Sequence, residues 1–160
     1  ATEILRKKYK GKIKFILVGL ADKDNKAGVP AEYLSDWSDG EYVEWVGYQK
    51  DMVGFYQNSH IVVLPSYREG MPKSLLEACA VGRAIVTTDA VGCRECVEEG
   101  VNGYKVPVHS SEKLAEAIEI LANDKDLIVK MGQNSRKKAE NEFDVKNVIA
   151  KHLEIYSDLL

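Results

Sequence analysis

The sequence has 160 residues, of which 45% are hydrophobic and 29% charged, and its formal net charge is −3. This length suits one globular domain, and the slightly acidic balance argues against binding nucleic acid through clustered Lys and Arg. No apolar run approaches the roughly 18–20 residues that cross a bilayer. Three cysteines, an odd number, favour a reducing compartment over a disulfide framework. We therefore expect a cytoplasmic chain.

The first part of the chain alternates between helical and strand patterns. The opening residues resemble the end of an amphipathic helix that Gly11 terminates, and no Met precedes them. We therefore expect an excised fragment whose preceding strand lies outside it. In chain order the sequence predicts a helix end at 1–12, a strand at 12–19, a loop at 21–30, a helix at 31–40, a strand at 42–47 and a helix at 50–59.

The second part continues the alternation and then becomes wholly helical. Pro72 near the start and Gly82 at the end mark one of the helices, and Ser110 or Ser111 caps another. Helices that alternate with strands predict a doubly wound α/β domain, with a parallel Rossmann-like sheet and helices on both faces. The elements expected are strands at 60–66, 83–88 and 102–108, and helices at 71–82, 93–100, 111–124, 125–143 and 144–160.

Two glutamates lie near one strand end. Such sheets bind ligands outside the carboxyl ends of their strands, and Pro65 ends a strand, so Glu69 is expected at that edge. Gly70 would permit a close backbone approach or a positive φ. Glu77, on the second turn of the following helix, would accept hydrogen bonds from vicinal hydroxyls such as those of ribose. Alternatively, each glutamate only complements the helix dipole.

The start of that helix is a candidate anion site. Pro72 fixes the entry of the helix without wasting a needed donor. The free N–H groups of Lys73, Ser74 and Leu75 would then face the same crevice, where a phosphate is favoured.

Glu69 and Glu77, with seven residues between them, resemble the E-x7-E motif of the retaining family-four glycosyltransferases, which have the GT-B fold. Residues 60–108 resemble the donor-binding core of that family, and residues 45–59 resemble the segment before it. The resemblance implies that residues 1–160 are the C-terminal, nucleotide-sugar-binding domain. The acceptor-binding N-terminal domain and the first βα element would lie outside the chain.

The resemblance also implies a role for each site residue. Glu69 would be the catalytic residue that contacts hydroxyls of the transferred sugar, and Glu77 would hold the ribose. Tyr48 would lie along the nucleobase, with buried packing as the alternative. The other donor-binding residues would be Gly47 beside the base, Gly70 and Met71 beside the sugar, and Ser74 and Leu75 at the diphosphate.

One part of the family pattern is missing. The Arg on a strand and the Lys-Gly at the next helix start, which supply cations to the diphosphate in the family, match nothing here. We therefore expect the isolated chain to be inactive. Arg68 and Lys73 are local cations that would substitute in part, or would only be solvated.

The sequence of residues 67–95 resembles that of bacterial members of this family, which extend lipid-linked glycans for capsule, lipopolysaccharide or N-glycan. This implies a UDP-sugar donor, in preference to GDP, and transfer of a hexose or N-acetylhexosamine to a lipid-linked glycan bound through the N-terminal domain. No cofactor, no metal and no nucleic acid are expected. The full-length protein would contact the membrane only peripherally, at the inner face of the cytoplasmic membrane.

Other functions remain open from the sequence. A UDP-N-acetylglucosamine 2-epimerase shares the GT-B architecture, and a nucleotide- or protein-binding α/β module, such as a receiver domain, would be no transferase. Asp22 to Asp24 have the spacing of a metal-binding DxD motif, but the residues around them are typical of a turn in a loop. Cys93 and Cys96 suggest zinc or redox chemistry, yet too few ligands accompany them, so we read Cys93 as a loop residue and Cys96 as packing, with oxidation between them left open.

The last predicted helix carries a broad apolar stripe. We expect part of this stripe to be exposed and to promote weak self-association. The stripe comprises Val145, Val148, Ile149, His152, Leu153, Ile155 and Tyr156.

Overall fold

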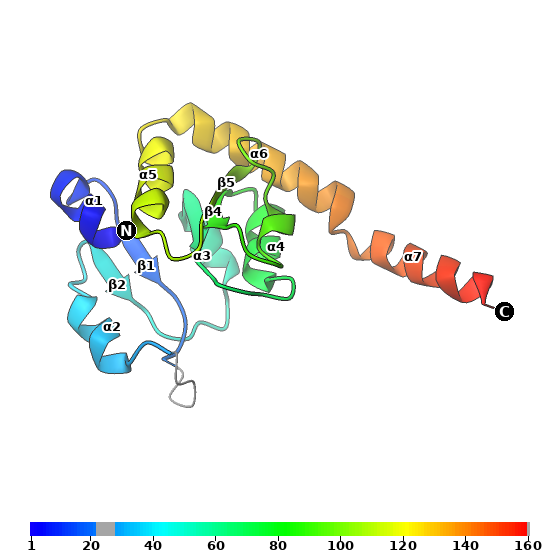
Figure 1. The fold of residues 1–160 in the computed structure, drawn as a ribbon, viewed down its shortest axis with the longest axis horizontal. Coiled ribbons are helices and arrows are strands. Elements are labelled where there is room, and N and C mark those ends of the chain that lie inside the picture. The colour runs from blue at the N-terminus through cyan, green and yellow to red at the C-terminus, as the bar shows by residue number, and fades with distance from the viewer. Residues whose placement is uncertain (22–27, 160) are drawn as a thin grey trace. The chain divides into compact units, whose positions relative to one another are not determined.

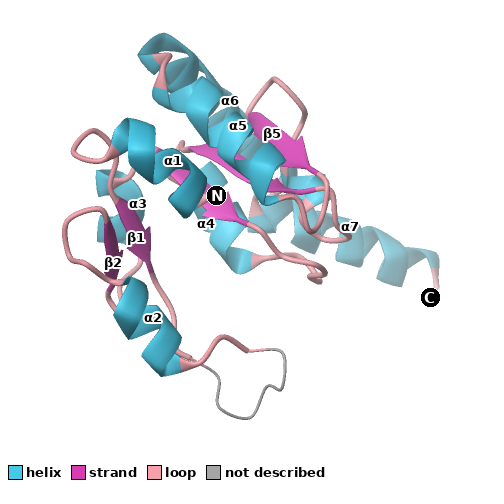
Figure 2. Cartoon of the chain, turned by 60° about the vertical axis from the view of Figure 1, so that its left-hand side comes forward, coloured by secondary structure: helices cyan, strands magenta, loops and turns pink. Residues whose placement is uncertain are grey.

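The computed structural model describes residues 1–21 and 28–159, and the chain contacts divide it into two compact units, Ala1–Met52 and Val53–Leu160 (Figure 1). Each unit combines parallel strands with helices (Figure 2). The predicted α/β class with parallel strands is therefore confirmed.

The first unit is built on a pair of parallel strands. Its elements are α1 (Thr2–Tyr9), β1 (Phe15–Leu17), α2 (Ala31–Trp37) and β2 (Val43–Trp45). Phe15 pairs with Val43 in the strand register. The strand predicted at 12–19 is shorter than expected, because the N–H groups of Lys12 and Ile13 both donate to the Tyr9 carbonyl in a turn that follows α1.

A turn before β2 is organised by one carboxylate. Asp39 Oδ1 accepts hydrogen bonds from the N–H groups of Val43, Tyr42 and Glu41, at 3.0, 2.7 and 3.1 Å. Asp39 Oδ2 pairs with Arg6 Nη1 at 2.8 Å. The hydrogen bonds from Val43 and Tyr42, more than the charge of Arg6, lower the pKa of Asp39 to about 2.

The second unit is built on a three-stranded parallel sheet in the order β3-β4-β5. Every residue of the central strand β4 is buried, so both of its faces are covered, and α4, α5 and α6 all pack against it. In Figure 1, α5 lies on one side of this strand and α4 on the other. The elements are α3 (Val53–Asn58), β3 (Ile61–Leu64), α4 (Lys73–Ala80), β4 (Ala84–Thr88), the 3-10 helix η1 (Arg94–Cys96), β5 (Gly103–Val106), α5 (Ser111–Ala122), α6 (Lys125–Glu142) and α7 (Val145–Asp158).

The described strands form two sheets, β1-β2 and β3-β4-β5, where the sequence predicts one. The alternation of helices and strands predicts that neighbouring strands run parallel, and they do. It does not determine which strands become hydrogen-bonded neighbours.

Local signals set several helix ends as predicted. Ser110 caps α5, and its side chain accepts a hydrogen bond from the Lys113 N–H group. Gly82, with φ of 70°, follows α4, and a Cβ at Gly132 of α6 would lie 2.4 Å from the Gly82 carbonyl oxygen. Glycine at position 132 therefore lets α6 cross close to the end of α4.

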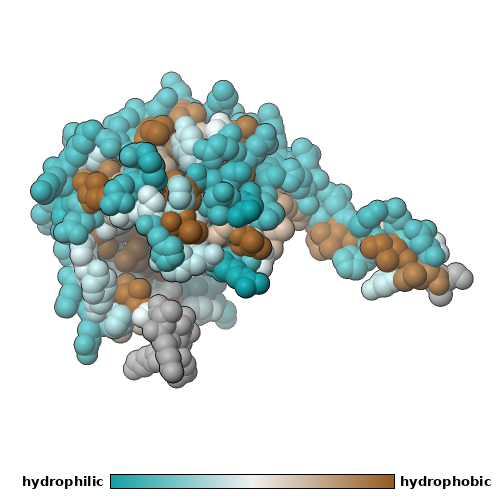
Figure 3. Space-filling view, viewed as in Figure 1, coloured by the Kyte–Doolittle hydropathy of each residue, from teal (hydrophilic) through white to brown (hydrophobic). Residues whose placement is uncertain are grey.

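The final helix α7 has no buried residue. Its apolar side chains are exposed (brown in Figure 3), as the sequence predicts for the stripe. In the part of the chain that the structure describes, no helix is both long enough and apolar enough to cross a membrane.

Candidate functional site

The segment 65–72, which follows β3, carries Glu69. The Thr88 hydroxyl, at the end of β4, donates a hydrogen bond to the Ser66 carbonyl. The Glu69 N–H group donates to the Val91 carbonyl at 3.0 Å. These bonds attach the Glu69 segment to the turn after the neighbouring strand, at the carboxyl edge where the sequence predicts the site.

A glycine makes this attachment possible. Gly92 has φ of 85°, and a Cβ there would lie 2.3 Å from the Gly70 carbonyl oxygen and 2.4 Å from that of Glu69. Gly70 itself has no positive φ, and a Cβ on it would meet nothing within 4 Å. Of the two alternatives predicted for Gly70, a positive φ is therefore wrong, and a close backbone approach stays a prediction. Gly92 requires glycine, because the Glu69–Gly70 backbone packs directly on it.

The segment after β5 reaches the same loop. The rings of Tyr67 and His109 are stacked, with centroids 4.2 Å apart and an interplanar angle of 25°. His109 has φ of 59°, and among the described residues it is the one non-glycine with positive φ. The sequence analysis did not predict this pair. The signal that could have indicated it is that each of the two residues follows a strand.

Glu69 is a half-buried residue, and its carboxylate makes no hydrogen bond or ion pair with any described residue. A half-buried carboxylate without a partner is costly unless something else hydrogen-bonds it. The Glu69 carboxylate is therefore available to a polar ligand at this edge.

The N-terminus of α4 follows directly. Pro72 is the N-cap residue and offers no side-chain hydrogen bond. The N–H groups of Lys73 and Ser74 have no acceptor among the described residues, whereas the Leu75 N–H group donates to the Pro72 carbonyl at 3.0 Å. Two of the three predicted donors are thus available to an anion, and an anion would have to share the third with Pro72.

Glu77 lies on the second turn of α4 and has two partners. Its Oε2 accepts a hydrogen bond from the Tyr56 hydroxyl at 3.1 Å, and its Oε1 lies 3.5 Å from Lys73 Nζ. Burial raises the pKa of Tyr56, and the hydrogen bond to Glu77 and the charge of Glu77 raise it further. No local sequence pattern indicates this contact, because the two partners lie 21 positions apart in the chain.

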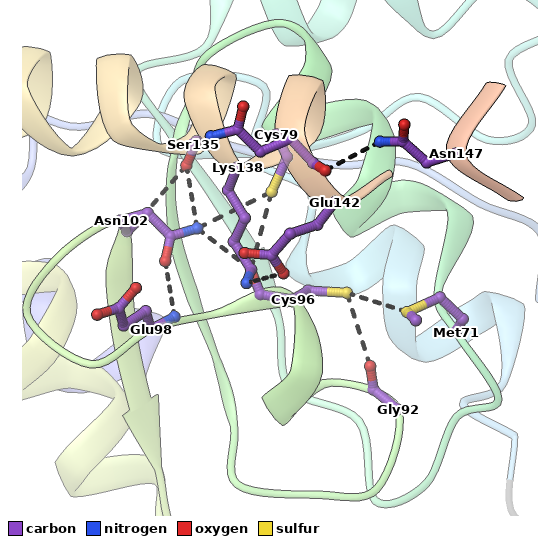
Figure 4. A network of polar contacts seen from close by, with 11 residues as sticks. Met71, Cys79, Gly92, Cys96, Glu98, Asn102, Ser135, Lys138, Glu142 and Asn147 are labelled. Atoms are coloured by element: carbon purple, nitrogen blue, oxygen red, sulfur yellow. Dashed lines mark hydrogen bonds and ion pairs between the residues drawn. The ribbon is translucent and has the colours of Figure 1, made fainter. Parts of the chain in front are cut away.

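Met71 contacts a network of polar and sulfur atoms in the interior (Figure 4). Its Sδ lies 3.7 Å from Cys96 Sγ, which also lies 3.6 Å from the Gly92 carbonyl. The amide of Asn102 donates to the Cys96 carbonyl at 3.1 Å and to Ser135 Oγ at 3.4 Å. The network therefore joins segment 65–72 to η1, to the turn before β5 and to α6.

The three cysteines are free and buried. Burial raises the pKa of Cys79 to about 11 and that of Cys96 to about 12, so both thiols stay protonated near neutral pH. Cys93 is the N-cap residue of η1 and is fully buried, so it packs in the core as Cys96 does. Among the described residues, no group of three His, Cys, Asp or Glu is arranged to hold a metal ion.

Gly47 and Tyr48 belong to the Ala1–Met52 unit, whereas the six other predicted site residues belong to Val53–Leu160. Gly47 has φ of 66°, and its carbonyl accepts the Gly19 N–H group at 2.9 Å. Tyr48 is 66% exposed, so the alternative of buried packing is wrong. A place for Tyr48 beside a nucleobase stays a prediction.

Asp22 to Asp24 lie outside the described residues. Arg68 is exposed, and Lys73, with a side chain that is 88% exposed, pairs with Glu77.

Comparisons with known proteins agree on one family. The pattern of the family described as glycosyl transferases group 1 matches residues 1–124. Over 151 residues, 94% of this chain, the sequence is 33% identical to N,N'-diacetylbacillosaminyl-diphospho-undecaprenol alpha-1,3-N-acetylgalactosaminyltransferase of Campylobacter jejuni. It is 30% identical over 131 residues, 82% of this chain, to the capsular polysaccharide biosynthesis glycosyltransferase CapM of Staphylococcus aureus.

A solved structure shares the fold. HepE of Anabaena, crystallised in complex with UDP, superposes on 91% of this chain with a TM-score of 0.82 and 25% identity. The match covers 41% of HepE, and this chain spans 39% and 34% of the Campylobacter and Staphylococcus relatives.

Proposed function

The chain belongs to the group 1 glycosyl transferases, and on this premise we propose that its 160 residues are the donor-binding domain of a retaining glycosyltransferase. The reaction moves a hexose or N-acetylhexosamine from a UDP-sugar to a growing, lipid-linked bacterial glycan. The acceptor binds through a further, N-terminal domain. No metal takes part in donor binding.

The arrangement around α4 is the observation that carries this proposal. The carboxylate of Glu69, which has no partner among the described residues, lies eight positions before Glu77 in the sequence. Between the two glutamates, the N–H groups of Lys73 and Ser74 at the start of α4 likewise have no acceptor in the part of the chain that the structure describes. One carboxylate suits sugar hydroxyls, the N–H groups suit a diphosphate, and the second carboxylate suits a ribose diol. A nucleotide-sugar offers these three groups in that order.

The relatives support the choice of donor and acceptor. The Campylobacter relative is named as an N-acetylgalactosaminyltransferase that acts on a diphospho-undecaprenol-linked sugar. HepE was crystallised with UDP and with UDP-glucose. For this chain, uridine as the base and a lipid-linked glycan as the acceptor follow by similarity and are part of the proposal.

In the proposed reaction the acceptor hydroxyl attacks the anomeric carbon while UDP leaves from the same face. Negative charge grows on the departing diphosphate, and the N–H groups at the start of α4 stabilise it because they are fixed in place beforehand. A single preorganised donor of this kind is worth about 3 kcal/mol in other enzymes. Glu69 holds the sugar so that the reacting atoms stay aligned.

The proposal is tested by titrating the 160-residue chain with UDP and with GDP in the presence of EDTA, while amide chemical shifts are recorded. UDP should bind with a dissociation constant of about 0.1–1 mM and should shift the amides of residues 70–77. Glu77→Ala should weaken UDP binding about 10-fold. The matched control is Glu112→Ala, which removes an acidic residue from the first turn of α5 and should leave UDP binding unchanged.

Three results contradict the proposal. If UDP does not bind at several millimolar, the chain has no donor site. If Glu77→Ala and Glu112→Ala weaken UDP binding equally, Glu77 only complements the helix dipole. A requirement for a divalent cation would favour the receiver-like alternative.

A further inference from the structure

We propose that Tyr56 is a positioning residue that orients the Glu77 carboxylate toward the ribose diol of the donor. The inference rests on the proposed function, since it assumes that Glu77 binds ribose. It adds a residue from a different helix, α3, to the site.

The side chain of Tyr56 is fixed. Its exposed fraction is 5%, and α3 packs against α4, which carries Glu77. The end of α3 is anchored as well, because Arg83 Nη1 donates a hydrogen bond to the Ser59 carbonyl at 3.1 Å and the Ser59 hydroxyl donates to the Phe55 carbonyl at 2.7 Å. A buried ring on an anchored helix brings its hydroxyl to one place.

The two partners of Glu77 differ in how firmly they are held. The Tyr56 hydroxyl comes from the interior and lies 3.1 Å from Oε2. Lys73 is 88% exposed and lies 3.5 Å from Oε1, so water screens the pair and the lysine can move aside. Tyr56 is therefore the partner that determines how the carboxylate is rotated.

The contact leaves the carboxylate able to bind a diol. The two oxygens of an ionised carboxylate offer about four acceptor positions, and Tyr56 uses one of them. Burial raises the pKa of Tyr56, and the hydrogen bond to Glu77 and the Glu77 charge raise it further, so the phenol stays protonated and donates its hydrogen to Glu77. Two ribose hydroxyls can then donate to the remaining positions, provided that the carboxylate keeps its orientation.

A packing role alone would not need the hydroxyl. Phenylalanine would fill the same space between α3 and α4, so the variant Tyr56→Phe removes the contact to Glu77 and preserves the ring. The matched control is Tyr42→Phe, which removes a buried tyrosine hydroxyl that donates to the Thr2 carbonyl at 2.9 Å, in the other unit.

The test compares UDP with 2′,3′-dideoxy-UDP, which lacks the diol, by amide-shift titration of the 160-residue chain. The parent chain should bind UDP about 10-fold more tightly than the dideoxy nucleotide. Tyr56→Phe should reduce this ratio to about 2–3 by weakening UDP alone, and Glu77→Ala should reduce it to about 1. Tyr42→Phe should keep the ratio of the parent, and thermal unfolding shows that each variant is folded.

The outcomes separate this inference from the proposed function. If the parent binds no UDP, or if Glu77→Ala keeps the parent ratio, the proposed function fails and the inference fails with it. If Glu77→Ala removes the discrimination but Tyr56→Phe keeps it, or weakens both nucleotides equally, Tyr56 only packs and the proposed function stands.

Discussion

At the scale of single residues, the site depends on where a side chain is absent as much as on the carboxylates. Glu69 and Gly70 lie against Gly92, whose positive φ and missing Cβ allow two segments of backbone to meet. A glycine's role of this kind depends on a neighbour more than 20 residues away, so no local pattern reveals it.

The two glycines give a paired prediction. Gly92→Ala should destabilise the chain by at least about 2 kcal/mol, because the new Cβ overlaps the carbonyl oxygens of Glu69 and Gly70 and the residue is held at positive φ. Gly70→Ala should stay within about 1 kcal/mol of the parent, since its Cβ meets nothing. Urea unfolding measures both, and equal stability of the two variants would show that the packing on Gly92 is unimportant.

A second residue-scale prediction concerns Asp39 and pH. Its pKa in the folded chain, about 2, lies below its unfolded value of about 3.9. The ionised Asp39 therefore stabilises the folded chain fully above about pH 4, and this contribution is lost as the pH falls toward about 2. The carboxyl-carbon chemical shift of Asp39 should titrate near the lower value. Arg6→Gln should move this midpoint upward only slightly, because the hydrogen bonds from Val43 and Tyr42 matter more, and a parent midpoint near 3.8 would contradict the assignment.

At the scale of elements, the sequence predicts which helices and strands form, and in what order, better than where each of them begins and ends. The helix cap at Ser110 and the glycine after α4 are local signals, and both are confirmed. The brief helix predicted at 93–100 is only the three-residue η1 (Arg94–Cys96), and strand lengths are overestimated, because ladder ends depend on partner strands. The contact of Tyr56 with Glu77 joins two helices through their packing, which periodicity within either helix cannot predict.

The last helix gives the prediction for this scale. Deleting residues 145–160 should change the melting temperature by less than about 2 °C, because no residue of α7 is buried within the chain. It should also weaken any concentration-dependent association, since the exposed apolar stripe is removed. The comparison is Leu121→Ala in α5, a fully buried leucine whose truncation should cost about 2–5 kcal/mol. Calorimetry and sedimentation measure the two effects, and a large loss of stability on deletion would contradict the expectation.

At the scale of the whole molecule, the predicted site residues are shared between the two compact units. Glu69, Met71 and Glu77 lie in Val53–Leu160, with a sheet and a helix N-terminus that α/β topology places at one edge. Gly47 and Tyr48 lie in Ala1–Met52. Alternation and strand ends predict where within a unit a ligand binds, but they contain no information about how separate units are placed.

The burial of all three thiols also matters for spectroscopy. Because each native cysteine is buried, a maleimide dye would modify an introduced surface cysteine in preference to them. Lys73→Cys would place such a dye at the first residue of α4, at an 88% exposed position, without prior removal of the native cysteines. The burial of the three native thiols thus leaves the surface free for a single fluorescent reporter.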